Sequence, residues 1–133
     1  MIEWSDVLDV GVFEIDQQHR ELVRRFNDFA TEVEHGGTHE RIVGFLIFMQ
    51  TYAIFHFAAE EELMRKVCFP GIEAHIIQHE LFTGKQFWMH EALRFDEKKV
   101  AKDTVDFVEK WIVNHVFVED KKIGAYVAGM SKP

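Results

Sequence analysis

The sequence predicts an all-α protein, an up-down-up-down four-helix bundle with a non-helical N-terminal arm. Three observations support this fold class. Apolar residues recur at the three- and four-residue spacing of a helix face, and no segment alternates with the period of two that is typical of strands. Only two prolines occur, one of them the last residue, so long helices are permitted. Short links between four long helical patterns indicate antiparallel neighbours.

The composition fits one globular domain. The chain has 133 residues, 47% of them hydrophobic and thirteen of them phenylalanine, which is enough to build a packed core. We expect a single domain over residues 1–133, with an arm at 1–15, the bundle at 16–127 and a tail at 128–133.

Charge and cysteine content limit the partners and the compartment. A formal net charge of −8 argues against nucleic acid or an anionic membrane as the main partner. No segment is expected to approach the roughly 18 uncharged apolar residues of a membrane span. The sole cysteine, Cys68, excludes an intramolecular disulfide and favours the cytoplasm. We expect it to be a small buried residue in a loop.

The first two helices have clear start and stop signals. The first pattern begins at Asp16, a good N-cap, and ends at Gly36-Gly37. Thr38 can cap a second helix that reaches about Lys66, after which "CFPG" breaks the pattern.

The third and fourth helices complete the bundle. The third is expected from about Ile72 to Leu93. A charged link, "DEKKVAKD", then precedes a fourth pattern whose apolar positions are Val105, Val108, Ile112 and Ile123.

Each predicted helix brings ligand-type side chains onto its apolar face. These are His19 on the first, His56 and Glu60 on the second, His75 and His79 on the third, and His115 and Asp120 on the fourth. Burying seven such groups in one core is costly unless something satisfies them together. Five imidazoles and two carboxylates are too many for one metal ion and suit two. Without thiolates, the set fits iron, manganese or zinc.

A zinc hydrolase built on His75, His79 and His115 is the competing interpretation. It leaves the ligand-type residues of the first two helices without a role, and no HExxH motif supplies a general base. The remaining histidines lie near helix ends or off the apolar faces and are expected at the surface: His35, His39 and His90.

The spacing of His115 and Asp120 does not fit a straight α-helix. At about 100° per residue, two positions five residues apart point roughly 140° away from each other. A π-type turn would bring them onto one face, and such turns are frequent at functional sites. We therefore predict a local irregularity between Val116 and Asp120, with Glu119 remaining a surface acid.

These motifs resemble those of the hemerythrin family, and more closely those of its bacterial hemerythrin-like members. The matching segments cover essentially the whole chain. They are "GVFEIDQQHREL" around His19, "HFAAEE" with His56 and Glu60, "HIIQH" with His75 and His79, and "NHVFVEDKKIG" with His115 and Asp120.

The resemblance implies a cofactor of two non-haem iron ions per chain, bridged by an oxo or hydroxo oxygen. It places His75, His79 and His115 on one iron and His19 and His56 on the other, with Glu60 and Asp120 bridging the pair. Two octahedral irons offer about twelve ligand positions. The protein and the bridging oxygen fill all but one, on the iron with two histidines, where dioxygen can enter.

The resemblance further implies reversible dioxygen binding, for oxygen storage, transport or sensing, and not an enzyme. Neutral imidazoles donate less negative charge than carboxylates, which favours binding over oxidation chemistry. A di-iron enzyme such as a peroxidase or a nitric oxide reductase is the alternative. A larger sensor protein or an oxygen-using enzyme would be the protein partner. The expected lining of the oxygen pocket is Leu22, Phe57, Trp111, Ile112 and Val116.

Overall fold

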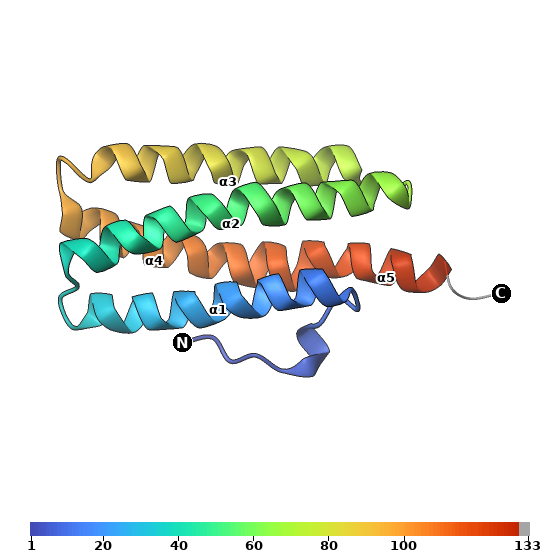
Figure 1. Cartoon of the computed structure of the whole chain (residues 1–133), viewed down its shortest axis with the longest axis horizontal. Coiled ribbons are helices and arrows are strands. Elements are labelled where there is room, and N and C mark those ends of the chain that lie inside the picture. The colour runs from blue at the N-terminus through green and yellow to red at the C-terminus, as the bar shows by residue number, and fades with distance from the viewer. Residues whose placement is uncertain (131–133) are drawn as a thin grey trace.

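The computed structural model describes residues 1–130 and arranges them as a bundle of four helical rods (Figure 1). Three rods are single helices: α1 (Phe13–Glu34), α2 (His39–Lys66) and α3 (Ile72–Ala92). The fourth is continuous and consists of α4 (Glu97–Trp111), a π-helical segment (Ile112–Glu119) and α5 (Asp120–Met130). Residues 1–130 contain no strand. The predicted all-α four-helix bundle is confirmed.

The connections alternate between the two ends of the bundle. Those joining α1 to α2 and α3 to α4 lie at one end, and the one joining α2 to α3 lies at the other (Figure 1). The arm, which contains a short 3-10 turn at Asp6–Leu8, runs beside α1. Part of the expected tail is helical, because α5 continues to Met130, while 131–133 lie outside the described residues.

The first helix begins earlier than the sequence predicts. It starts at Phe13, so Asp16 lies inside the first turn and is not the N-cap. The Asp16 carboxylate accepts hydrogen bonds from the backbone N–H groups of Val10 (2.7 Å) and Gly11 (3.2 Å). An acid that reaches back in this way satisfies amides ahead of the helix and complements the helix dipole.

The segment "DEKKVAKD", which we expected to be a charged link, forms the N-cap and the first turns of α4. Asp96 caps α4 by accepting a hydrogen bond from the backbone N–H of Lys99 (3.1 Å). The charges then face solvent, where Lys99 pairs with Asp103 at 2.7 Å, while Val100 is buried. A charged segment with an apolar residue at helical spacing is therefore an amphipathic helix start and not a loop.

Two further expectations were wrong. Cys68 is exposed, in a turn after α2 where its backbone φ is 55°. We also expected no segment that could span a membrane, yet α2 has the length and hydropathy to do so. This is weak support for a membrane helix, because the core helix of a bundle passes the same test; 44% of the apolar window of α2 is buried within the bundle.

The arm is fixed to the bundle by specific contacts. Asn27 of α1 exchanges hydrogen bonds of 2.9 and 2.7 Å with the backbone of Ile2. Trp4 packs edge-on against Phe117, with the Arg20 guanidinium 5.1 Å from its ring centre. These contacts hold the arm across α1 and the fourth rod.

Gly124 of α5 lets the arm approach closely. A Cβ placed there would lie 2.0 Å from the carbonyl oxygen of Val10. We expect Gly124→Ala to lower the free energy of unfolding by about 1–3 kcal/mol, because overpacking against backbone outweighs the better helix propensity of alanine. Denaturant unfolding measures this. Gly129→Ala, on the same helix with open space around it, should be neutral or stabilising.

Candidate metal centre

The structure brings the seven predicted site residues together in one buried group. Each is at most 3% exposed, and together they form what we call the histidine–carboxylate cluster: His19, His56, Glu60, His75, His79, His115 and Asp120. The cluster draws on all four rods, near the start of α1 and α3 and near the end of α2. Residues far apart in the sequence therefore meet in one place.

Glu60 lies between two groups of histidines. Its Oε1 is 2.5 Å from Nε2 of His75 and 3.0 Å from Nε2 of His79. Its Oε2 is 3.0 Å from Nε2 of His56 and 3.8 Å from Nε2 of His19. Each carboxylate oxygen thus faces a different pair of imidazoles.

Asp120 divides the histidines in the same way. Its Oδ1 lies 3.0 Å from Nε2 of both His75 and His115, and its Oδ2 lies 2.9 Å from Nε2 of His19. One oxygen of each carboxylate therefore faces members of a three-histidine set, His75, His79 and His115, and the other faces a two-histidine set, His19 and His56. Within each of these two sets the donor atoms lie within 4.8 Å of one another.

The π-helical segment places Asp120 in the cluster. It spans Ile112–Glu119 and contains His115, so the predicted irregularity is confirmed, although it starts before Val116. The wider turn brings positions five residues apart onto one face. Glu119 points away from the cluster, is 30% exposed and pairs with Lys122 at 3.1 Å, as expected of a surface acid.

Outer contacts orient three of the rings. An oxygen acceptor lies beside Nδ1 of each: Gln18 Oε1 at 2.5 Å from His56, Glu61 Oε2 at 2.8 Å from His79, and Gln78 Oε1 at 2.6 Å from His115. An oxygen can only accept here, so Nδ1 carries the proton and the Nε2 lone pair faces the cluster. The helical pattern did not predict these acceptors. Each is adjacent in sequence to a cluster residue, but a polar residue there is equally typical of a solvent-facing position.

Several buried atoms of the cluster lack a hydrogen-bond partner among residues 1–130. They are Nδ1 of His19, Oε2 of Glu60, Nε2 of His115 and both carboxylate oxygens of Asp120. Some lie about 3 Å from a neighbouring cluster atom, yet without the angles that a hydrogen bond requires. Buried polar atoms are rarely left unsatisfied. Oxygen and imidazole donors gathered in this way fit a cation.

The ionisation of the cluster also suits a cation. Burial acts to raise the pKa of Glu60, but the adjacent imidazoles of His56, His75 and His79 outweigh it and hold the pKa well below the ordinary value. Burial and the Glu60 charge oppose ionisation of Asp120, yet its histidine neighbours still lower its pKa. The two carboxylates therefore stay ionised in the core and offer negative charge to a metal.

Comparison with known proteins is decisive for the family. A family model described as the hemerythrin HHE cation binding domain matches residues 10–127, which is most of the chain. The chain belongs to the hemerythrin family. Hemerythrins bind dioxygen at non-haem iron, and the histidine–carboxylate cluster of this member fits such a metal site.

Individual relatives agree with this assignment. A bacteriohemerythrin of Clostridium acetobutylicum is 25% identical over 92% of this chain and 98% of its own length. A bacteriohemerythrin of Stenotrophomonas maltophilia is 31% identical over 91% of this chain and 78% of its own length. A hemerythrin-like protein of Naegleria gruberi is 27% identical over 90% of this chain and 87% of its own length.

Apolar walls enclose the cluster of this hemerythrin-family chain. Four of the five residues expected to line an oxygen pocket are buried and Trp111 is half-buried. Phe57 stacks on the ring of His79 and Trp111 on that of His115, each at 3.9 Å between ring centres. The two rings therefore cover part of the three-histidine side of the cluster with apolar carbon.

Tyr52 is a further neighbour of the cluster that the helical pattern did not predict. Its ring stacks on His56 at 4.7 Å, and its buried hydroxyl has no partner among the described residues. Burial and the charges of Asp120 and Glu60 raise the pKa of this phenol well above its ordinary value. The hydroxyl therefore remains a hydrogen-bond donor on the two-histidine side. Its position four residues before His56 was the available signal.

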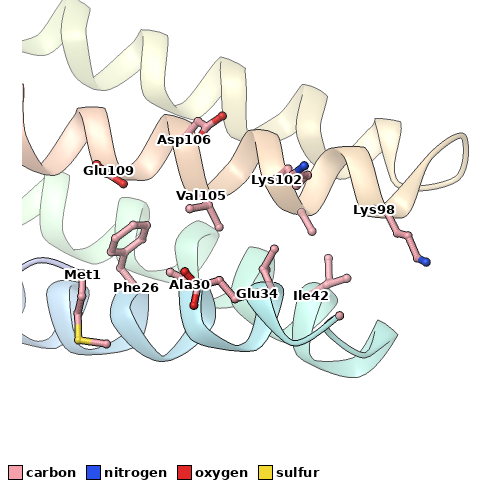
Figure 2. A pocket seen from close by; sticks show the side chains of 13 residues that line it. Met1, Phe26, Ala30, Glu34, Ile42, Lys98, Lys102, Val105, Asp106 and Glu109 are labelled. Atoms are coloured by element: carbon pink, nitrogen blue, oxygen red, sulfur yellow. The ribbon is translucent and has the colours of Figure 1, made fainter.

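A separate cavity of about 560 Å³ lies between α1 and α4 (Figure 2). Phe26, Ala30 and Glu34 of α1 face Lys102 and Val105 of α4 across it. None of the cluster residues or the expected pocket-lining residues borders this cavity. It therefore gives no access to the hemerythrin metal site.

Proposed function

We propose that this chain binds dioxygen reversibly at a pair of non-haem iron ions, for oxygen storage, transport or sensing. One observation carries the proposal: each of two buried carboxylates turns one oxygen toward histidines of the three-histidine set and the other toward histidines of the two-histidine set. Such an arrangement suits two adjacent cations that share both carboxylates and differ in their number of imidazole ligands.

The ligand assignment follows the two sets of donor atoms. His75, His79 and His115 would hold one iron, His19 and His56 the other, and Glu60 and Asp120 both. When bound, two ferrous irons would supply an open coordination position and the electrons that hold dioxygen. The set with two histidines has fewer protein donors, which supports placing the open position there.

The remaining residues would position these ligands and protect the site. Gln18, Glu61 and Gln78 fix the imidazole orientations through Nδ1, which also makes the rings better donors. Leu22, Ile112 and Val116 are fully buried, and with Phe57 and Trp111 they would form the apolar lining of the oxygen pocket. The free hydroxyl of Tyr52 can donate a hydrogen bond to a ligand on the two-histidine side.

Metal analysis combined with oxygen exposure tests this function. We expect about two irons per chain and, after anaerobic reduction, an optical spectrum that appears in air and reverses under vacuum. One zinc per chain in protein purified with iron available would contradict the di-iron site. Rapid oxidation with sustained consumption of added reductant, in the presence of peroxide or nitric oxide, would instead support the di-iron enzyme.

A further inference from the structure

The outward faces of α2 and α3 are apolar. Seven large apolar side chains on these helices are between 50% and 69% exposed. Phe55 of α2 borders residues of α1, and the other six are Ile47 and Ile54 on α2, and Ile77, Leu81, Phe87 and Trp88 on α3. Ile77, Leu81 and Trp88 follow the helical spacing of one face, on the side of α3 opposite its buried histidines. They form a ridge along the outside of the bundle. We call the six side chains the α2–α3 face.

The other half of the bundle has a different surface. The outward side of α1 carries Arg24, Arg25 and Asp28, and that of α4 carries Lys99 and Asp103, all in ion pairs or open to solvent. α1 and α4 are thus ordinary amphipathic helices. α2 and α3 instead carry apolar side chains on their outward sides as well as on their buried sides. Apolar residues on both sides of a helix are typical of a helix that is covered on both sides. A contiguous exposed apolar surface of this kind marks an interaction site.

A groove runs beside the ridge. It has a volume of about 580 Å³, and Ile54 of α2 and Phe87 of α3 contribute to its walls, with Phe57 and His79 among the residues beneath. The groove therefore shares two side chains with the α2–α3 face, and its residues Glu80 and Phe87 are the sequence neighbours of the ridge residues Leu81 and Trp88. A surface with both features can match a two-fold rotated copy of itself, because each ridge then enters the opposite groove.

We propose that the α2–α3 face binds a second copy of this chain in a symmetric dimer. The six side chains expose roughly 700 Å² at about 200 Å² per large side chain, close to the roughly 800 Å² that each partner contributes to a standard interface. Charge agrees with self-association. Lys85 is exposed beside the ridge, while Glu61 and Glu80 border the groove, so opposite charges meet when ridge enters groove.

A membrane surface fits the face less well. The chain carries a net charge of −8, and two acids border the groove, so anionic lipid would be repelled from it. The proposed dimer does not depend on iron or dioxygen. It would cover the groove next to His79 and shield the three-histidine side of the metal centre from solvent.

Sedimentation of the iron-loaded full chain over a range of micromolar concentrations tests the dimer. Wild type should be a dimer, and Leu81→Glu and Trp88→Glu should each raise its dissociation constant about tenfold or more, because both place a charge at the centre of the interface. Both side chains are more than two thirds exposed, so the fold should survive, which circular dichroism checks. Phe13→Glu, which changes an 80% exposed residue off this face, should remain dimeric.

Three results would overturn the proposal. The first is a monomeric wild type throughout the concentration range. The second is a dimer whose dissociation constant is unchanged in correctly folded Leu81→Glu and Trp88→Glu proteins. The third is binding of the monomer to phosphatidylserine vesicles that these two substitutions abolish, because the face would then be a membrane surface. Retention of iron by all three variants is expected whichever occurs, so the dimer and the oxygen-binding function fail independently.

Discussion

Replacing His75 with alanine should abolish stable binding of the iron pair and lower the melting temperature by about 5 °C or more. His75 lies within 3.0 Å of both carboxylates, so its loss removes a donor and leaves two buried acids less well satisfied. A metal that binds only the folded bundle stabilises it by mass action, and that stabilisation is lost with the metal. Iron analysis and thermal unfolding measure the two effects.

Histidines outside the cluster provide the matched control. His39 is 69% exposed and pairs with Glu97 at 2.6 Å, and His90 lies outside the cluster. His39→Ala and His90→Ala should keep both irons and the oxygen-dependent spectrum. Loss of iron in either variant would show that the five ligand histidines were chosen wrongly. Full iron content in His75→Ala would likewise show that His75 is not a ligand.

Asp120→Asn should weaken iron binding by more than about 100-fold without unfolding the bundle. Exchange of an outer-shell partner commonly costs 10- to 100-fold in metal affinity, and Asp120 is proposed as a direct ligand of both ions. The amide keeps the side chain's volume, and Glu60 still faces both histidine sets, so the helices should remain assembled. Competition with a chelator gives the affinity, and circular dichroism reports the fold.

Glu119→Gln makes the same change of charge one residue earlier and should leave iron binding intact. The contrast tests the π-helical segment directly, because a regular α-helix through this region would turn Asp120 away from His115. Equal losses of affinity in the two variants would indicate a general charge effect. A larger loss in Glu119→Gln would mean that the register of the π-helical segment is wrong.

The sequence alone was enough to predict the fold class and which residue types meet in the core. Apolar spacing defines one face of each helix, and ligand-type residues that interrupt those faces must enter the same interior. Even the π-helical segment was predictable, because His115 and Asp120 are five positions apart and cannot share a face in a regular α-helix. These are properties of local periodicity.

Local periodicity could not locate every helix end. The sequence pattern placed the start of α1 at Asp16, because a carboxylate is typical of an N-cap. In the structure the Asp16 carboxylate accepts hydrogen bonds from backbone amides of the preceding arm. The charged residues after Asp96 were expected to form a link, because the segment is mostly polar and Val100 alone does not define an apolar helix face. In both cases the group that decides the helix end comes close only when the chain is folded: the arm amides for Asp16 and the core residues around Val100.

Only the tertiary structure decided which atom faces which within the site. Periodicity places Glu60 on an inward face, but the division of its two oxygens between histidine sets depends on how four rods pack around it. The same holds for Gln18 and Gln78, which look like surface residues until the facing helix supplies an imidazole. It holds for the apolar α2–α3 face too, because a helix pattern shows that a side chain is apolar and not whether another helix covers it.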